Sequence, residues 1–141
     1  MNIPDTILSK LTEQQVVYLA TVDGDQPKVR PVTLIYKDNG FYVITGARGG
    51  VNAHKLTQIN RNPKVEYYLT LKGEDGDGFI RGEATASIID NQNIRALIYN
   101  AIGWAKNFFP TVDHPDYVLL ELQHHALSYR NPGEYEIQNI P

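Results

Sequence analysis

The chain contains no cysteine, only one methionine and one tryptophan, and no run of eighteen or more apolar residues. The absence of cysteine excludes disulfide bonds, thiolate nucleophiles and metal or iron–sulfur sites built on thiolates. The absence of a long apolar run predicts that no helix spans a membrane. The stretch from Met1 to Asp5 lacks the basic and apolar regions of a secretory signal, so we expect a cytoplasmic protein.

An excess of basic residues is also lacking. The 13 lysines and arginines are outnumbered by 16 aspartates and glutamates, which gives a formal net charge of −3. The basic residues are scattered, whereas nucleic-acid-binding proteins usually gather them in a patch or stripe. We therefore expect neither nucleic acid nor a membrane among the partners of this protein.

What the sequence does contain is a series of strand-forming segments. Its 141 residues suit a single domain, residues 1–141, with one core. Six segments are rich in β-branched and aromatic residues or alternate between apolar and polar side chains, which predicts strands. The predicted strands cover residues 16–22, 28–37, 41–45, 64–71, 79–89 and 117–129.

Helical periodicity predicts three helices set before or between these strands, over residues 5–15, 51–60 and 91–109. Asp90 is the candidate N-cap of the last helix. The turn Lys37-Asp38-Asn39-Gly40, which contains an Asn-Gly pair, predicts a hairpin between the second and third strands. Because most strands are joined by hairpin-length turns, we predict a mainly β fold, a six-stranded antiparallel barrel with flanking helices.

A glycine-rich segment between Thr45 and Lys55 is a candidate anion site. A strand ends at Thr45, the loop carries Arg48, and a helix is predicted after Gly50. Free N–H groups at a helix start attract anions, and glycines let the backbone approach a phosphate closely. Arg48 and Lys55 could both bind that anion. The alternative interpretation is a flexible loop with two solvated cations.

Pro31 lies inside the second predicted strand, where a proline cannot donate to the ladder. It predicts a bulge or an edge at which backbone groups are available to a ligand. Arg30 shares a strand face with Val32, Leu34 and Tyr36, so a cation rims an apolar wall. Such a wall suits a flat aromatic ring with a polar edge. The alternative is an edge strand whose arginine makes a surface ion pair.

The order of several short motifs is more informative than any one of them. The motifs are Val17-Tyr18-Leu19-Ala20-Thr21, Gly24-Asp25-Gln26-Pro27, Arg30-Pro31-Val32, Gly40-Phe41-Tyr42-Val43-Ile44-Thr45, Lys55 to Val65 with its Asn62-Pro63 stop, and Gly82-Glu83-Ala84. In this order they resemble the pyridoxamine 5′-phosphate oxidase-like flavin-binding split barrels. That family includes general-stress proteins and nitroimidazole-resistance-type reductases. The resemblance extends over about residues 11–90, with a looser match in the last helix and strand.

The resemblance implies FMN bound in a groove between the two barrels of a homodimer. It implies that Arg30, Pro31 and Val32 contact the edge of the isoalloxazine ring, while Thr45 and Lys55 hold the phosphate. The other implied contacts are residues of the glycine-rich loop and late aromatic residues of the partner chain, for which core or dimer contacts are the alternative. They are Gly46, Arg48, Gly49, Gly50 and Asn52 in the loop, and Trp104, Phe108 and Phe109 among the aromatics.

An FMN-dependent oxidoreductase acting on a small molecule is the first functional hypothesis, with Arg30 stabilising the reduced, anionic flavin. No dinucleotide fingerprint is present, so NAD(P)H as electron donor would bind transiently. A non-catalytic flavin or heme carrier or sensor is the alternative, and a deazaflavin-dependent reductase is a third. Many relatives carry serine or threonine where this chain has Ala53, so one phosphate hydrogen bond would be missing.

Of the four histidines, His114, His124 and His125 are interpreted as structural or surface residues rather than metal ligands, whereas His54 is an exception because it lies beside the candidate phosphate loop. The adjacent pair would point to opposite faces of a strand and so would not share a metal through its spacing. The acidic, glycine-rich stretch 73–78 lacks the later glutamate of an EF-hand and is predicted to be a solvated turn.

Overall fold

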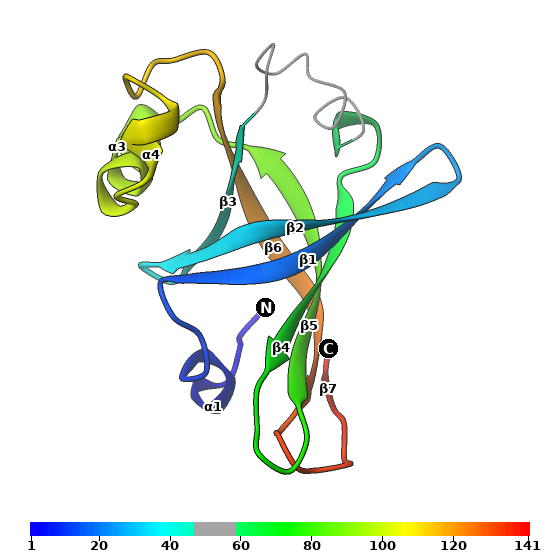
Figure 1. Cartoon of the computed structure of the whole chain (residues 1–141). Helices are drawn as coiled ribbons and strands as arrows, with labels where there is room; N and C mark the ends of the chain where they lie inside the picture. The colour runs from blue at the N-terminus through cyan, green and yellow to red at the C-terminus, as the bar shows by residue number, and fades with distance from the viewer. Residues whose placement is uncertain (47–58) are drawn as a thin grey trace.

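Strands dominate the computed structural model, which describes residues 1–46 and 59–141 (Figure 1). Within these ranges six long strands form a closed antiparallel barrel. Their bounds are Gln14–Asp23 (β1), Gln26–Lys37 (β2), Gly40–Gly46 (β3), Lys64–Leu71 (β4), Gly78–Ile88 (β5) and Tyr117–Arg130 (β6). The predicted fold class is confirmed.

The order of strands around the barrel is β3-β2-β1-β4-β5-β6, and pairing of β3 with β6 closes it. A short strand that the sequence analysis did not predict, β7 (Gln138–Ile140), pairs with the second half of β6. The two ends of β6 therefore have different partners, since its first half pairs with β3. Closure removes most sheet edges that would otherwise need protection.

The predicted hairpin between β2 and β3 is confirmed, and its turn is Lys37-Asp38-Asn39-Gly40 as predicted. Asp38 and Asn39 both have positive φ, at 49° and 65°. Gly40 already pairs with Lys37 across the ladder. A two-residue hairpin turn of this kind needs positive φ at both central positions, which aspartate and asparagine tolerate.

The helices are shorter than the periodicity predicted. The first, α1 (Asp5–Leu8), ends well before residue 15, because Gln14 and Gln15 already belong to β1 and pair with β2. The predicted helix over 51–60 lies outside the described residues except for its end, where residues 59–61 are helical.

The long predicted helix over 91–109 is divided into α3 (Gln92–Ala101) and α4 (Ala105–Phe108). Asn91 caps α3 by accepting hydrogen bonds from the backbone N–H groups of Asn93 and Ile94, so the prediction of Asp90 as N-cap is wrong. Ile102 adopts an extended conformation and redirects the chain. Ile102 and Phe109, which lie on either side of α4, are both buried in the same apolar cluster.

The buried side chains of the described residues form two apolar clusters. The first fills the barrel and includes Val17, Leu34 and Tyr67. The second lies outside β3 and β6, where α3 and α4 cover the barrel wall (Figure 1). Within the described ranges no helix has both the length and the apolar character needed to cross a bilayer.

Candidate functional site

A cavity at one end of the barrel interior brings together four of the predicted site residues, Arg30, Pro31, Val32 and Thr45. Its volume is about 240 Å³. The wall consists of residues from β1, β2, β3 and β6, together with the helical turn before β4. The described lining residues are Leu19, Thr21, Arg30, Pro31, Val32, Val43, Ile44, Thr45, Ile59 and Leu120.

The cavity lies where β2 and β3 separate. The paired positions of these strands extend only from Lys37 back to Leu34 on β2. Beyond that point β2 stays paired with β1, and β3 stays paired with β6, but no described residue pairs with the other edge of β2. Among the described residues the barrel is therefore split along residues 26–33 of β2, and no described strand pairs with the backbone at this edge.

Pro31 occupies this split without disturbing the ladder to β1. It stands opposite Tyr18 in an unbroken register, so the predicted edge position is confirmed and the predicted alternative of a bulge is wrong. A proline fits such a ladder only if its nitrogen faces away from the partner strand. Since backbone groups alternate in direction along an antiparallel strand, those of Val29 and Thr33 also face the open edge.

The wall of the cavity is apolar apart from Arg30 and two threonines. Arg30 is half-buried and shares its face with Val32 and the fully buried Leu34, as the alternation predicted. The guanidinium group carries five donors and no acceptor, so it favours an anionic or electron-rich partner. An apolar wall with a cation at its rim can hold a flat ring that has a polar edge.

Thr21 and Thr45 are the buried polar residues of this cavity. Their exposed fractions are only 3% and 7%. Neither hydroxyl has a hydrogen-bond partner among the described residues. A buried hydroxyl without a partner costs roughly 1–3 kcal/mol of stability, so these groups are suited to an incoming polar ligand.

The remaining loop candidates are only partly placed. Gly46 closes β3 and pairs with Tyr117 of β6. The other predicted contacts, together with Ala53 and His54, lie outside the described residues. Those contacts are Arg48, Gly49, Gly50, Asn52 and Lys55.

The late aromatic residues lie away from the cavity, on the α4 side of the barrel. The Trp104 indole N–H donates to Oε1 of Gln14 at 2.8 Å, and its ring packs edge-to-face on Phe108. Phe109 is buried in the second cluster and serves the core of its own chain. Phe108 is 69% exposed. None of the three lines the cavity of its own chain.

Two of the histidines lie next to each other on β6 and face different surroundings. His124 points into the barrel, where its Nε2 lies 2.8 Å from the Tyr67 hydroxyl. Burial, followed by the neighbouring His125, lowers the pKa of His124 to about 4. His125 stands at an irregularity in the β5–β6 register and hydrogen-bonds to Thr85. No group of three metal-ligating side chains occurs in the described part of the chain.

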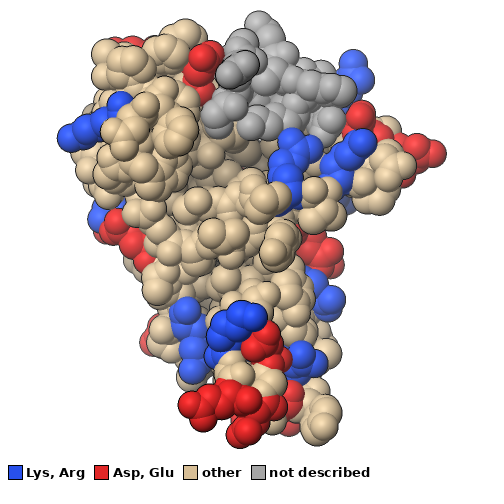
Figure 2. Space-filling model, in the orientation of Figure 1, with Lys and Arg blue, Asp and Glu red and all other residues tan. Residues whose placement is uncertain are grey.

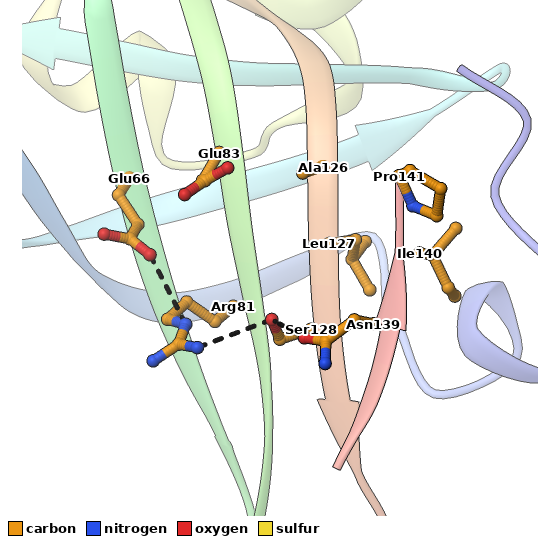
Figure 3. Close-up of a pocket in the computed structure, with 9 residues that line it drawn as sticks. All are labelled: Glu66, Arg81, Glu83, Ala126, Leu127, Ser128, Asn139, Ile140 and Pro141. Atoms are coloured by element: carbon orange, nitrogen blue, oxygen red, sulfur yellow. Dashed lines mark hydrogen bonds and ion pairs between the residues drawn. The ribbon is translucent and has the colours of Figure 1, made fainter.

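A second hollow, of about 470 Å³, lies on the outer surface beside β7 (Figure 3). Four of its polar side chains are paired with one another. Arg81 reaches Glu66 at 3.4 Å and Ser128 at 3.4 Å, and Ser128 donates to Asn139 at 2.9 Å. Because these contacts satisfy the guanidinium within the surface network, this hollow is a weaker candidate than the cavity in the barrel.

Thr21 occurs in one of the sequence motifs, but it was not among the predicted site residues. A signal was present in the strand alternation. Val17 and Leu19 point inward on β1, and the next inward position is the hydroxyl-bearing Thr21. A polar residue at a core position, next to a split in the sheet, is informative once the inward face is known.

The described residues thus define the split-barrel class: a closed antiparallel barrel of six strands whose β2 edge opens beside a cavity with polar groups. Comparison with protein families identifies the group within this class. Residues 3–131 match the pyridoxamine 5′-phosphate oxidase family, and the chain belongs to that family. A comparison with curated protein sequences gives no match.

Solved structures with the same fold support the assignment. A NimC/NimA family protein from Clostridium acetobutylicum is 25% identical, with a TM-score of 0.76 and coverage of 96% of this chain and 90% of that one. General Stress Protein 26 from Bacillus anthracis is 23% identical, with a TM-score of 0.74 and coverage of 96% and 97%.

More distant structures share the fold alone. A FAD-binding protein from Mesorhizobium loti is 17% identical, with a TM-score of 0.67 and coverage of 90% of this chain and 92% of that one. A heme binding protein from Mycobacterium smegmatis is 14% identical, with a TM-score of 0.70 and coverage of 90% and 52%. The fold therefore accommodates more than one kind of cofactor.

Proposed function

We propose that this protein binds FMN at the cavity between β2 and β3 and uses it in the redox chemistry of a small molecule. The observation that carries the proposal is the meeting of Arg30, Pro31, Val32 and Thr45 around one cavity. The family assignment supports a flavin as the class of ligand. When bound, FMN supplies the redox chemistry, and the protein binds and orients it.

In this proposal each predicted site residue has a role that matches its chemistry. Val32 packs against the flat face of the ring, and Arg30 donates to its electron-rich edge. The open backbone edge beside Pro31 offers further hydrogen bonds. Thr45 and Lys55 bind the phosphate, with Gly46, Arg48, Gly50 and Asn52 as neighbours in sequence. NAD(P)H is the proposed electron donor and binds only transiently.

A homodimer with the cofactor at its interface is part of the proposal. The outer face of β1, β2 and β4 carries exposed apolar side chains, among them Val16 (64%), Tyr18 (53%), Val29 (67%) and Tyr68 (37%). They lie close together, because Tyr18 pairs with Tyr68 across the sheet. Figure 2 shows this face with a central band free of charged residues. A contiguous apolar patch of this kind marks an interaction surface.

The same proposal places Trp104 and the exposed Phe108 against the partner's cofactor. Gel filtration of the flavin-loaded protein should give a dimer. Tyr18→Glu should shift it toward the monomer, because a charge at the interface is costly to desolvate. A flavin-loaded monomer would contradict the shared site, and an unchanged dimer in the variant would place the interface elsewhere.

The cofactor is tested by the visible spectrum of the purified protein and by identifying what it releases on heating. A yellow protein that releases FMN supports the proposal. A Soret band would favour the heme carrier, and uptake of deazaflavin in preference to FMN would favour the third hypothesis. A flavin that neither NADH nor NADPH reduces, with several acceptors tried, would favour a carrier or sensor over an enzyme.

The phosphate contacts are tested by Lys55→Ala, which should weaken FMN binding by roughly 1.5–3 kcal/mol through loss of a charge-assisted contact. Arg30→Gln should weaken the binding of both FMN and riboflavin, because its proposed contact is with the ring. Lys72→Ala is the matched control, since Lys72 pairs with Asp77 at 3.1 Å and does not line the cavity. Unchanged affinity in Lys55→Ala would remove that residue from the site.

A further inference from the structure

We propose that Thr21 is a ligand-binding residue whose hydroxyl, together with that of Thr45, binds one acceptor oxygen of the molecule held in the cavity. The identity of that molecule as FMN rests on the proposed function. The role of Thr21 rests on the geometry of the barrel, and neither the motifs nor the family assignment gives it one.

Two residues whose buried hydroxyls lack described partners line the same cavity. Thr21 lies near the end of β1, and Thr45 near the end of β3, so they approach the cavity from different strands. Both side chains are more than nine-tenths buried. Neither has a hydrogen-bond partner among the described residues. Leaving two such groups unsatisfied is costly, and a ligand that pairs with both recovers that cost.

Other buried hydroxyls of the described chain are satisfied by the fold itself. Tyr67 pairs with His124, Tyr99 donates to the backbone carbonyl of Phe109, and Tyr117 donates to that of Arg95. The remaining unpartnered buried atom in the described residues is Nε of Arg130, whose Nη2 is nevertheless bonded to a backbone carbonyl. Missing partners are thus concentrated in the cavity.

The chemistry of the lining selects the kind of atom that is bound. A hydroxyl can donate or accept, whereas the guanidinium of Arg30 only donates. A ligand group that satisfies both threonines near that cation must therefore accept hydrogen bonds. Phosphate oxygens and the carbonyl oxygens of an electron-rich ring both have this property, and FMN carries both.

Thr21→Val tests the proposal, because it removes the hydroxyl and keeps the branched shape. We expect the dissociation constant for FMN to rise about tenfold, as the loss of one hydrogen bond to a charged or strongly polar acceptor implies. The melting temperature of the ligand-free protein should not fall, because the variant removes an unsatisfied buried group. Thr21→Ser should keep most of the affinity.

Thr70→Val is the matched control, the same substitution on β4 at a position that does not line the cavity. It should leave the affinity for FMN unchanged. Riboflavin identifies which oxygen Thr21 binds. A loss of affinity for FMN alone points to a phosphate oxygen, which Thr45 is also proposed to bind, and supports the proposal. An equal loss for riboflavin would place Thr21 at the ring or ribityl chain and would overturn the oxygen shared with Thr45.

The proposal fails if Thr21→Val lowers the melting temperature and leaves flavin affinity unchanged, because Thr21 would then be a structural residue. Inorganic phosphate provides a second probe that needs no flavin. The wild-type protein could bind no flavin and still be stabilised by phosphate, with Thr21→Val abolishing that stabilisation. In that case the proposed function fails, while Thr21 retains its role as a ligand-binding residue. If wild type responds to neither probe, both proposals are overturned.

Discussion

Buried polar side chains are hydrogen-bonded to each other at one end of the barrel interior and lack described partners at the other. At one end, near the start of β3, the ring of Phe41 packs on His124, and His124 is hydrogen-bonded to Tyr67. At the other end, near the finish of β3, Thr21 and Thr45 have no described partner. The same barrel thus contains two buried polar side chains that satisfy each other and two that have no described partner.

The difference teaches which end serves the fold and which serves a ligand. A satisfied buried pair contributes to stability and loses that contribution when one partner is removed. An unsatisfied pair gains from a partner that the protein itself does not supply. Changes at the Tyr67–His124 end should therefore alter the free energy of unfolding, whereas changes at the Thr21–Thr45 end should alter ligand affinity.

The largest effect is expected from Gly82→Val. Gly82 stands opposite Tyr67 on the neighbouring strand, and any Cβ there would overlap the Tyr67 ring. That ring is 1% exposed and fixed by its bond to His124, so it cannot move aside. We expect the free energy of unfolding to fall by about 3 kcal/mol, as overpacking of a tight core implies. Urea denaturation measures it.

Gly103→Ala is the control for this prediction. A Cβ at Gly103 meets no atom within 4 Å, so the substitution introduces no overlap. Its effect should stay within about 1 kcal/mol, the ordinary range for a surface change. Equal destabilisation by both variants would show that the Tyr67 end is not tightly packed.

The sequence could predict those features of the two ends that depend on neighbouring residues in the chain, but not those that depend on contacts between distant residues. Val65, Tyr67 and Leu69 alternate with polar residues in the sequence and are all buried in β4, because strand periodicity is local. It could not reveal that Tyr67 meets His124, which lies 57 positions away in the chain. The lack of partners at Thr21 is likewise a property of the assembled barrel.

The helices and β7 show the same limit. Apolar periodicity continued through Ile102, but α3 ends at Ala101 and Ile102 is extended. Gln138–Ile140 carries no strand pattern of its own and becomes β7 by pairing with β6. Among the predicted site residues, Arg30 to Val32 and Thr45 meet at one cavity, since their strands are neighbours of the split.

Acidification should produce the next largest effect. The folded-state pKa of His124 is lowered from 6.5 to about 4, chiefly by burial. The unfolded chain therefore takes up a proton at higher pH than the folded protein does. The stability contributed by neutral His124 is complete above pH 6.5 and is lost as the pH falls toward 4, at a cost of up to about 3 kcal/mol. Urea denaturation across this window measures the loss.

His124→Gln isolates this histidine from the carboxylates that also titrate in acid. Glutamine can still hydrogen-bond to Tyr67 but does not titrate, so its stability should depend less on pH between 6.5 and 4. Parallel profiles for wild type and variant would mean that His124 is not protonated on unfolding in this window.

Tyr67→Phe should have a smaller effect and sharpens the comparison directly. The variant keeps the ring and leaves Nε2 of His124 without its partner, at a cost of about 1–2 kcal/mol. FMN affinity should not change, because Tyr67 does not line the cavity. The pattern is the reverse of that expected for Thr21→Val. A weakened flavin complex in Tyr67→Phe would mean that the two ends of the barrel are coupled.

The smallest effect is expected from Pro31→Ala at the split. Alanine restores a backbone N–H that faces the open edge of β2, where it adds no bond to β1. Because the unfolded chain of the variant has more conformational freedom, the free energy of unfolding should fall by about 0.4–1 kcal/mol. Pro27→Ala should give the same loss, since Pro27 lies four residues earlier on β2 and faces the same way. If Pro31→Ala instead stabilised the ligand-free protein, the new N–H would have found a partner, and the β2 edge would be closed rather than available to a ligand.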